Sequence, residues 1–126
     1  MDREVIFIDA NVLLETILKD RKNIIKAQDY VSSHNIIISP LSAHLFVYFG
    51  LRDGLDLNVL LDMLNRHRFT SFGTEEIIWA TKNHQDENFE DALQVACAVM
   101  QDCQTFVTFD KKLAQKYSQF INVKVL

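Results

Sequence analysis

Short apolar segments recur along the chain, and stretches with the apolar spacing of amphipathic helices separate them. This alternation predicts short strands joined by helices, an arrangement that favours a mainly parallel sheet covered on both faces. We therefore predict an α/β fold, a three-layer α/β/α sandwich. The expected strands are Glu4–Ile8, "NIIIS", "FTSF", "TFVTF" and "VKVL". The expected helices are Val12–Lys19, Asn23–His34, Ser39 to about Gly50, Asp56–Arg66, Thr74 to about Lys82, Asn88–Met100 and Lys111–Tyr117.

Length and composition are typical of one globular domain. With 126 residues, of which 48% are hydrophobic and 24% charged, we expect a single domain over residues 1–126. No apolar stretch approaches the roughly 20 residues that a membrane-spanning helix needs, so no membrane association is expected. The start, Met1-Asp2-Arg3-Glu4, is too acidic for a signal peptide. We therefore expect a cytoplasmic protein.

Several kinds of site are excluded by the absence of their motifs. Cys97 and Cys103 lack CxxC spacing, and Cys97 lies in the apolar run "ALQVACAVM", which predicts a core residue. The four histidines are scattered without ligand spacing, so a zinc site is not expected. Neither GxGxxG nor GxxxxGK[ST] occurs, which argues against a nucleotide cofactor.

The charge balance restricts nucleic-acid contacts to local patches. A net charge of −4 gives no basic surface for a long duplex. Two short basic groups could still contact phosphates, namely Arg66-His67-Arg68 and the lysines at 111, 112 and 116.

Acidic residues follow two of the expected strands and begin a helix between them. Asp9 ends the first strand and Asp110 follows "TFVTF", while Asp91 lies in the first turn of the buried helix. In open α/β sheets, ligands bind at the carboxyl ends of the strands where the chain order reverses. If the two strands are neighbours, the three carboxylates face one cleft.

Helix capping is the alternative interpretation for each of these residues. Asp9 or Asn11 could cap the first helix, Asn88 with Asp91 fits a capping box, and Asp110 could cap the last helix. Taken together, however, three converging carboxylates would repel one another unless a cation lay between them. Oxygen ligands without Cys or His suit Mg²⁺ or Mn²⁺, which assist phosphodiester hydrolysis, and Asn11 would support the site.

Four segments in register resemble the PIN-domain ribonucleases, in particular the VapC-type toxins of toxin–antitoxin pairs. They are "FIDANVLLE", "IISPLS", "NFEDALQVACA" and "FVTFDKKL". The resemblance implies an endoribonuclease that depends on Mg²⁺ or Mn²⁺, cleaves RNA, binds an antitoxin protein and forms a homodimer. It assigns Asp9, Asp91 and Asp110 as catalytic and metal-binding residues, with Asn11 beside them and Thr108 as the hydroxyl before the last acid.

One acidic residue of the family pattern is missing. The pattern places a Glu in the helix after the second strand, at the position of Leu45, and residues 35–51 contain no Asp or Glu. His44 is one position away, about 100° round the helix, and is interpreted as a surface or packing residue. Candidate substitutes elsewhere are Glu15, Asp86, Glu87 and Glu90.

The missing acid leaves two functions open. The protein could be a weakened nuclease whose metal site has only three carboxylates, or an inactive module that binds RNA or a protein without cleavage. A phosphotransfer domain is a third class, but it needs DxD or DxT where this chain has "DAN".

Apolar residues between 45 and 64 also predict either core packing or a dimer or antitoxin surface. They are Leu45, Phe46, Tyr48, Phe49, Leu57, Leu60, Leu61 and Leu64.

Overall fold

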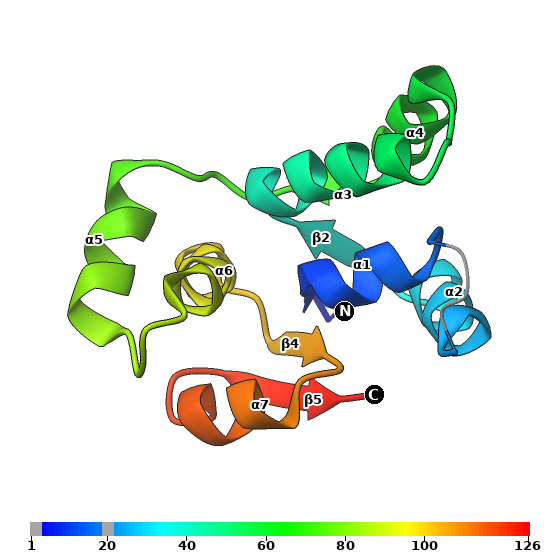
Figure 1. Ribbon diagram of the computed structural model, residues 1–126. Coiled ribbons are helices and arrows are strands. Elements are labelled where there is room, and N and C mark those ends of the chain that lie inside the picture. Colours follow the sequence, from blue (N-terminus) through cyan, green and yellow to red (C-terminus); the bar gives the residue numbers. More distant parts are fainter. Residues whose placement is uncertain (1–3, 19–21) are drawn as a thin grey trace.

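Every expected helix and strand is present in the computed structural model, which describes residues 4–18 and 22–126 (Figure 1). Most differ from their predicted ends by one or two residues. The first helix, however, ends at Glu15, well before the predicted end at Lys19, which lies outside the described residues, and the third strand covers Arg68–Phe69 rather than "FTSF". The strands are β1 (Ile6–Ile8), β2 (Ile36–Ile38), β3 (Arg68–Phe69), β4 (Thr105–Thr108) and β5 (Asn122–Val125). The helices are α1 (Ala10–Glu15), α2 (Ile24–Ser33), α3 (Pro40–Arg52), α4 (Leu57–Leu64), α5 (Thr74–Asn83), α6 (Phe89–Met100) and α7 (Lys111–Tyr117).

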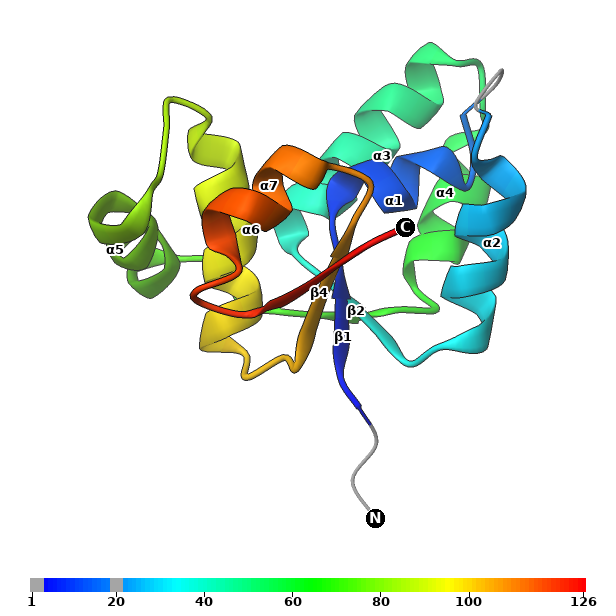
Figure 2. The same ribbon diagram turned by 90° about the horizontal axis from the view of Figure 1, so that it is seen from below.

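The strands form one sheet in the order β3-β2-β1-β4-β5, and all four pairings are parallel. The chain moves outward from β1 to β2 and β3, then returns to the other side of β1 with β4. The order therefore reverses between β1 and β4, which are neighbours as the sequence analysis required. In Figure 2, α1 and α7 begin at the same end of these two strands.

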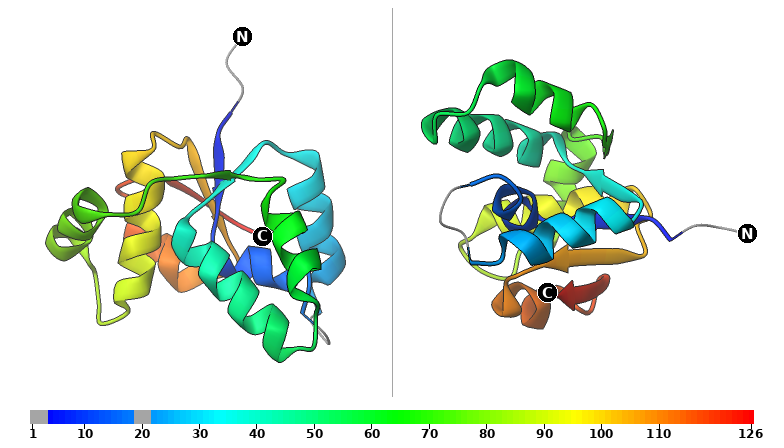
Figure 3. Two further views of the ribbon diagram at one scale, coloured as in Figure 1. Left: turned by 90° about the horizontal axis from the view of Figure 1, so that it is seen from above. Right: turned by 90° about the vertical axis from the view of Figure 1, so that its right-hand side faces the viewer.

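Helices cover both faces of the sheet, which confirms the predicted three-layer sandwich (Figures 2 and 3). Alternate residues of each strand point to opposite faces. Phe7, Ile37 and Phe106 join the core beneath α5, α6 and α7. Ile6, Ile8 and their neighbours in β2 join the core beneath α1 to α4. Among the described residues, no helix is both long and apolar enough to cross a membrane.

The buried helix α6 lies against the sheet with its apolar residues inward. Val95, Ala96 and Cys97 are almost fully buried, so the predicted core position of Cys97 is confirmed. Burial raises the pKa of the Cys97 thiol to about 11, which keeps it protonated and unreactive. Cys103 is also a free buried cysteine.

A buried polar network joins α6 to the start of α3. Ser39 is the N-cap of α3 and accepts a hydrogen bond from the Ser42 backbone N–H (3.0 Å). The Ser39 hydroxyl donates to Gln94 Oε1 (2.8 Å), and Gln94 Nε2 donates to Ser42 Oγ (2.9 Å). All three side chains are at most 1% exposed. Because a buried polar group without a partner is costly, this network fixes the two helices relative to each other.

We predict that Gln94→Leu destabilises the fold, since it removes the bonds to both serine hydroxyls while preserving much of the side-chain volume. The free energy of unfolding should fall by about 1–3 kcal/mol. Urea denaturation measures this, with the exposed Gln115→Leu on α7 as the control, which should change stability by less than about 0.5 kcal/mol. Equal stability of the two variants would show that the network contributes nothing.

Candidate active site at the carboxyl ends of β1 and β4

The hydroxyl of Thr108 connects three of the predicted site residues. It donates a hydrogen bond to Asp9 Oδ2 (2.9 Å) and accepts one from Asn11 Nδ2 (3.1 Å). It also accepts the Asp110 backbone N–H (3.0 Å). Thr108 is fully buried at the end of β4, and Asp9, directly after β1, is 6% exposed. The strand pairing of β1 with β4 thus brings together residues that lie about a hundred positions apart in the sequence.

Asn11 reinforces the same junction from α1. Its amide donates to Thr108, and its Oδ1 accepts the backbone N–H of Phe109 (3.2 Å). The Asn11 side chain is therefore held by both a side chain and a backbone group of the β4 end. The sequence analysis expected Asn11 to support the site, and its hydrogen bonds to Thr108 and to the Phe109 backbone do so.

Each acidic segment also begins a helix, as the capping interpretation predicted for Asp9 and Asp110, whereas only half of the predicted Asn88–Asp91 capping box forms, because the Asn88 N–H bonds Asp86. Asp9 is the N-cap of α1, and its Oδ1 accepts the Ala10 N–H (2.8 Å). Asp110 caps α7 through Oδ1, which accepts the N–H groups of Lys112 and Leu113 (2.9 and 3.3 Å). Asn88 caps α6 by accepting the Asp91 N–H (3.3 Å). Capping and ligand binding are compatible, because a capping carboxylate keeps further lone pairs.

Burial and mutual repulsion make two of the carboxyls hard to ionise. Burial is the main reason that the pKa of Asp9 is raised to about 7, with repulsion from Asp91 and Glu90 adding to it and the Thr108 bond opposing it. Burial, followed by repulsion from Asp110, Asp86 and Glu90, raises the pKa of Asp91 to about 6. A cation bound near these groups would relieve both costs.

A pocket of about 280 Å³ opens beside these carboxyls. Its polar lining comes from Asp9, Asn11, Glu90 and Asp91, and its apolar wall includes Leu45 and Phe49 of α3. The position at which the family pattern expects a Glu therefore does face this pocket, but as a leucine. Asp110 lies outside the pocket lining, although it is close enough for its charge to raise the Asp91 pKa.

Glu90 is a pocket residue whose place the sequence left open. It was one of four candidate substitutes for the missing acid, and it alone of these lines the pocket. Of the others, Asp86 is paired with Lys116 of α7. The lysine also lowers the Asp91 pKa, so it partly offsets the negative charge. Leu14 of α1 also belongs to the apolar wall of the pocket. The sequence could not identify it as a pocket residue, because it lies in an apolar run that is equally typical of the core.

The donor chemistry fits a hard divalent cation, since the pocket and its border offer only oxygen ligands. Within residues 4–18 and 22–126, however, no three Asp, Glu, His or Cys side chains are gathered closely enough to hold a metal ion as they stand. Asp9, Asp91 and Glu90 around one pocket, with Asp110 outside its lining but near Asp91, are the groups that a metal ion would have to draw together.

The apolar residues predicted between 45 and 64 divide between core and surface. Phe46, Leu60 and Leu64 are buried, as the core interpretation predicts. Tyr48, Leu57 and Leu61 are between 41% and 50% exposed, so they are available to a partner.

Known structures of similar fold include toxins and toxin–antitoxin complexes. Mycobacterium tuberculosis VapC20, a sarcin-ricin loop cleaving toxin, has 15% identity and a TM-score of 0.73, covering 94% of this chain and 98% of its own. A toxin–antitoxin complex from Klebsiella pneumoniae has 10% identity and a TM-score of 0.70, covering 94% and 95%. Rickettsia felis VapBC2, bound to a promoter DNA fragment, has 13% identity and a TM-score of 0.68, covering 96% and 98%.

These identities establish a shared fold, and no curated protein matches the sequence. The PIN domain family model, in contrast, matches residues 6–118, which include Asp9, Asn11, Asp91, Thr108 and Asp110. The match extends from β1 to the end of α7 and so contains the whole β1–β4 junction. This chain belongs to the PIN domain family.

Proposed function

We propose that this protein is a VapC-type endoribonuclease, the toxin of a toxin–antitoxin pair, and that it hydrolyses RNA phosphodiester bonds with Mg²⁺ or Mn²⁺. The observation that carries the proposal is the pocket in which buried Asp9 and half-buried Asp91 repel each other at the β1–β4 junction. The similarity to toxin structures supports it. As the sequence analysis expected, we place the protein in the cytoplasm.

In this proposal, Asp9, Asp91 and Asp110 hold the metal ion, which would supply positive charge for the phosphate and lower the pKa of a bound water. Thr108 orients Asp9 by donating to Oδ2, so that the carboxylate does not rotate away from the pocket. Asn11 fixes Thr108 in turn. Leu45 and Phe49 give the pocket an apolar wall that limits water around the carboxylates.

Lys111 and Lys112 supply a local contact for the RNA backbone. Both are exposed in the first turn of α7, directly after Asp110. Their charges can attract phosphates toward an otherwise anionic edge. The proposal also includes an antitoxin partner and a homodimer, for which exposed Tyr48, Leu57 and Leu61 offer apolar contact area.

An inactive binding module is the second candidate function, and Leu45 is the observation that favours it. The family's Glu is absent from this pocket position, and the described side chains form no ready metal-ligand group. Such a module would bind RNA or a protein partner without turnover.

We predict that Asp9→Asn reduces Mn²⁺-dependent cleavage of single-stranded RNA by at least about 100-fold. The fold should persist, since Asn is also a good N-cap and its one amide oxygen can keep the contact with the Ala10 N–H, although the hydrogen bond from Thr108 is then lost. Gel assays of cleavage, calorimetry with Mn²⁺ and circular dichroism measure the three properties, with the exposed Asp62→Asn as control. Wild-type protein that leaves RNA intact at high concentration would replace the nuclease proposal with the binding module.

Stability should depend on pH in a direction set by Asp9. Its pKa is about 7 in the folded chain and near 3.8 when exposed, so between these values the folded protein holds more protons than the unfolded chain. In EDTA, the free energy of unfolding should therefore fall as pH rises from about 4 to about 7. The Asp9 contribution is on the order of 4 kcal/mol, and Mn²⁺ at pH 7.5 should restore it.

Denaturation of wild type and Asp9→Asn across this range measures the effect, because the variant cannot ionise at this position. The wild-type curve should fall more steeply than that of the variant. Parallel curves would show that Asp9 titrates as an ordinary exposed carboxyl.

Glu90 should compensate in part for the missing family acid. We predict that Glu90→Gln weakens Mn²⁺ binding, while Leu45→Glu strengthens it by adding a carboxylate to the same pocket. Each change should be about tenfold in affinity, measured by calorimetry. Glu87→Gln, on an exposed residue outside the pocket lining, is the control for net charge. An unchanged affinity in Glu90→Gln would exclude Glu90 from the site.

A further inference from the structure

The first turn of α6 carries two of the pocket residues, and a short loop connects it to α5. Glu90 and Asp91 lie in this turn and line the pocket beside Asp9. The loop covers residues 84–88, and most of it is exposed. Exposed loops are fixed by hydrogen bonds and ion pairs more than by packing. The placement of both carboxyls therefore depends on the contacts that hold this loop.

Two consecutive residues in the last turn of α7 hold the loop before α6. The Lys116 ammonium donates a hydrogen bond to Asp86 Oδ2 and forms an ion pair with it. The Tyr117 hydroxyl accepts the backbone N–H of Gln85 (3.1 Å). Tyr117 is fully buried in the core beneath α5, α6 and α7, so its hydroxyl is a well-fixed anchor. The loop is thereby attached to α7 at two adjacent positions.

A series of hydrogen bonds continues from this attachment to Asp91. Asp86 accepts the backbone N–H of Asn88 through Oδ1 (3.1 Å), while its Oδ2 pairs with Lys116. Asn88 is the N-cap of α6, and its side chain accepts the Asp91 N–H (3.3 Å). Lys116 is therefore connected to the backbone of Asp91 through Asp86 and Asn88. We refer to Lys116, Tyr117, Asp86 and Asn88 as the α7 clamp.

The same helix carries another site carboxylate at its opposite end. Asp110 caps the start of α7, while the α7 clamp joins the last turn of α7 to the loop before α6. Asp110 and Asp91 repel each other, and this repulsion favours a larger separation of α6 and α7 at the site. The clamp opposes that separation, because it ties the two segments together.

Charge alone does not account for a lysine at this place. The ammonium of Lys116 interacts with the charges of Asp86, Asp91 and Asp110. A positive charge beside a cation site repels the cation, so by its charge Lys116 opposes the metal binding proposed for this pocket. The ion pair also contributes little to global stability, since its two side chains are 34% and 31% exposed. Lys116 therefore needs a different explanation from charge or stability.

We propose that Lys116 and Tyr117 are positioning residues, which hold the loop before α6 so that Glu90 and Asp91 remain in the pocket. The consequence for metal affinity rests on the proposed function, whereas the positioning itself requires no metal ion. Carboxylates that are already in place do not have to be ordered when the cation binds, which strengthens binding. Neither positioning residue lines the pocket, so both act through the loop.

Hydrogen exchange of the whole protein in EDTA tests the positioning without a metal ion. We expect Lys116→Met to speed exchange of the Asp91 amide, and Tyr117→Phe that of the Gln85 amide, each about 3- to 10-fold. The amides of residues 95–98 in the middle of α6 should stay unchanged, which shows that the variants are folded. Lys116→Arg keeps the ion pair and should match the wild type. Unchanged exchange in both variants overturns the proposal.

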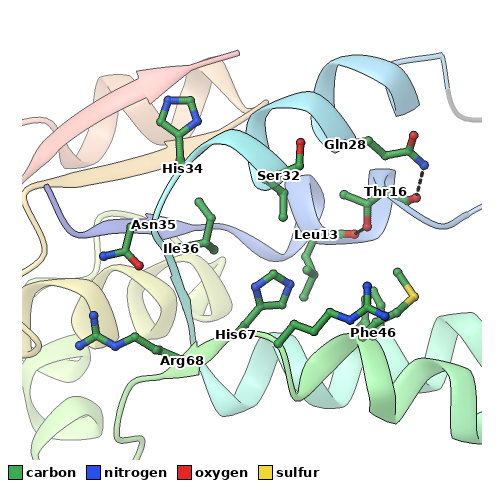
Figure 4. A pocket seen from close by; sticks show the side chains of 13 residues that line it. Leu13, Thr16, Gln28, Ser32, His34, Asn35, Ile36, Phe46, His67 and Arg68 are labelled. Carbon is green, nitrogen blue, oxygen red and sulfur yellow. Dashed lines mark hydrogen bonds between the residues drawn. The ribbon is translucent and has the colours of Figure 1, made fainter. Parts of the chain in front are cut away.

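Calorimetry with Mn²⁺ tests the consequence for the site. By charge alone, Lys116→Met would tighten Mn²⁺ binding and Tyr117→Phe would leave it unchanged. Positioning predicts that both weaken it, about 3- to 10-fold. Lys82→Met, in the exposed last turn of α5, is the control for charge. Gln28→Leu is the control for a lost hydrogen bond, because the Gln28 amide donates to the Thr16 carbonyl (2.9 Å) in the pocket between α2 and α4 (Figure 4).

The outcomes separate this proposal from the proposed function. Weaker Mn²⁺ binding in both clamp variants, with recovery in Lys116→Arg, supports positioning. Tighter binding in Lys116→Met, or an equal loss in Gln28→Leu, overturns it. Wild-type protein that binds no Mn²⁺ overturns the proposed metal site instead, and faster exchange confined to the loop then still supports the positioning.

Discussion

The parallel pairing of β1 with β4 is the constraint on which the rest of the site depends. It sets Ile8 beside Val107, and the next residues, Asp9 and Thr108, then meet through a hydrogen bond. Because the chain order reverses between these strands, neither α1 nor α7 has to cross in front of their carboxyl ends. The space left there is where polar side chains collect, as in other open parallel sheets.

The same aspartates that cap helices also form the candidate site. Asp9 and Asp110 each satisfy backbone N–H groups at the start of a helix, and this fixes their carboxylates near the strand ends. Burial, together with repulsion between the carboxyls that collect here, raises the pKa of Asp9 and Asp91. The caps stabilise the helices, while the repulsion between the carboxyls stores free energy that a bound cation would release.

Local patterns in the sequence predicted the elements and the three layers, because strand alternation and helix caps depend on near neighbours. They brought Asp9 and Asp110 to one cleft only on the condition that their strands are neighbours, and Thr108 was assigned through the family resemblance. They did not predict which acids share the pocket. Glu90 and Leu45 come from α6 and α3, and their convergence depends on how those helices pack through Ser39 and Gln94. The attachment of the loop before α6 to Lys116 and Tyr117 was likewise not predicted, since it joins segments that only the folded chain brings together.

Leu45 has a physical consequence beyond the loss of one ligand. A glutamate at this position would add one more negative charge to those that, together with burial, already make Asp9 and Asp91 hard to ionise. With leucine there, the pocket tolerates its remaining carboxyls more easily when no metal ion is bound, because there is less repulsion to offset. The same change reduces the attraction for a divalent cation. We therefore expect leucine at this position to exchange metal affinity for stability of the metal-free fold, with Glu90 in the same pocket supplying part of the missing charge.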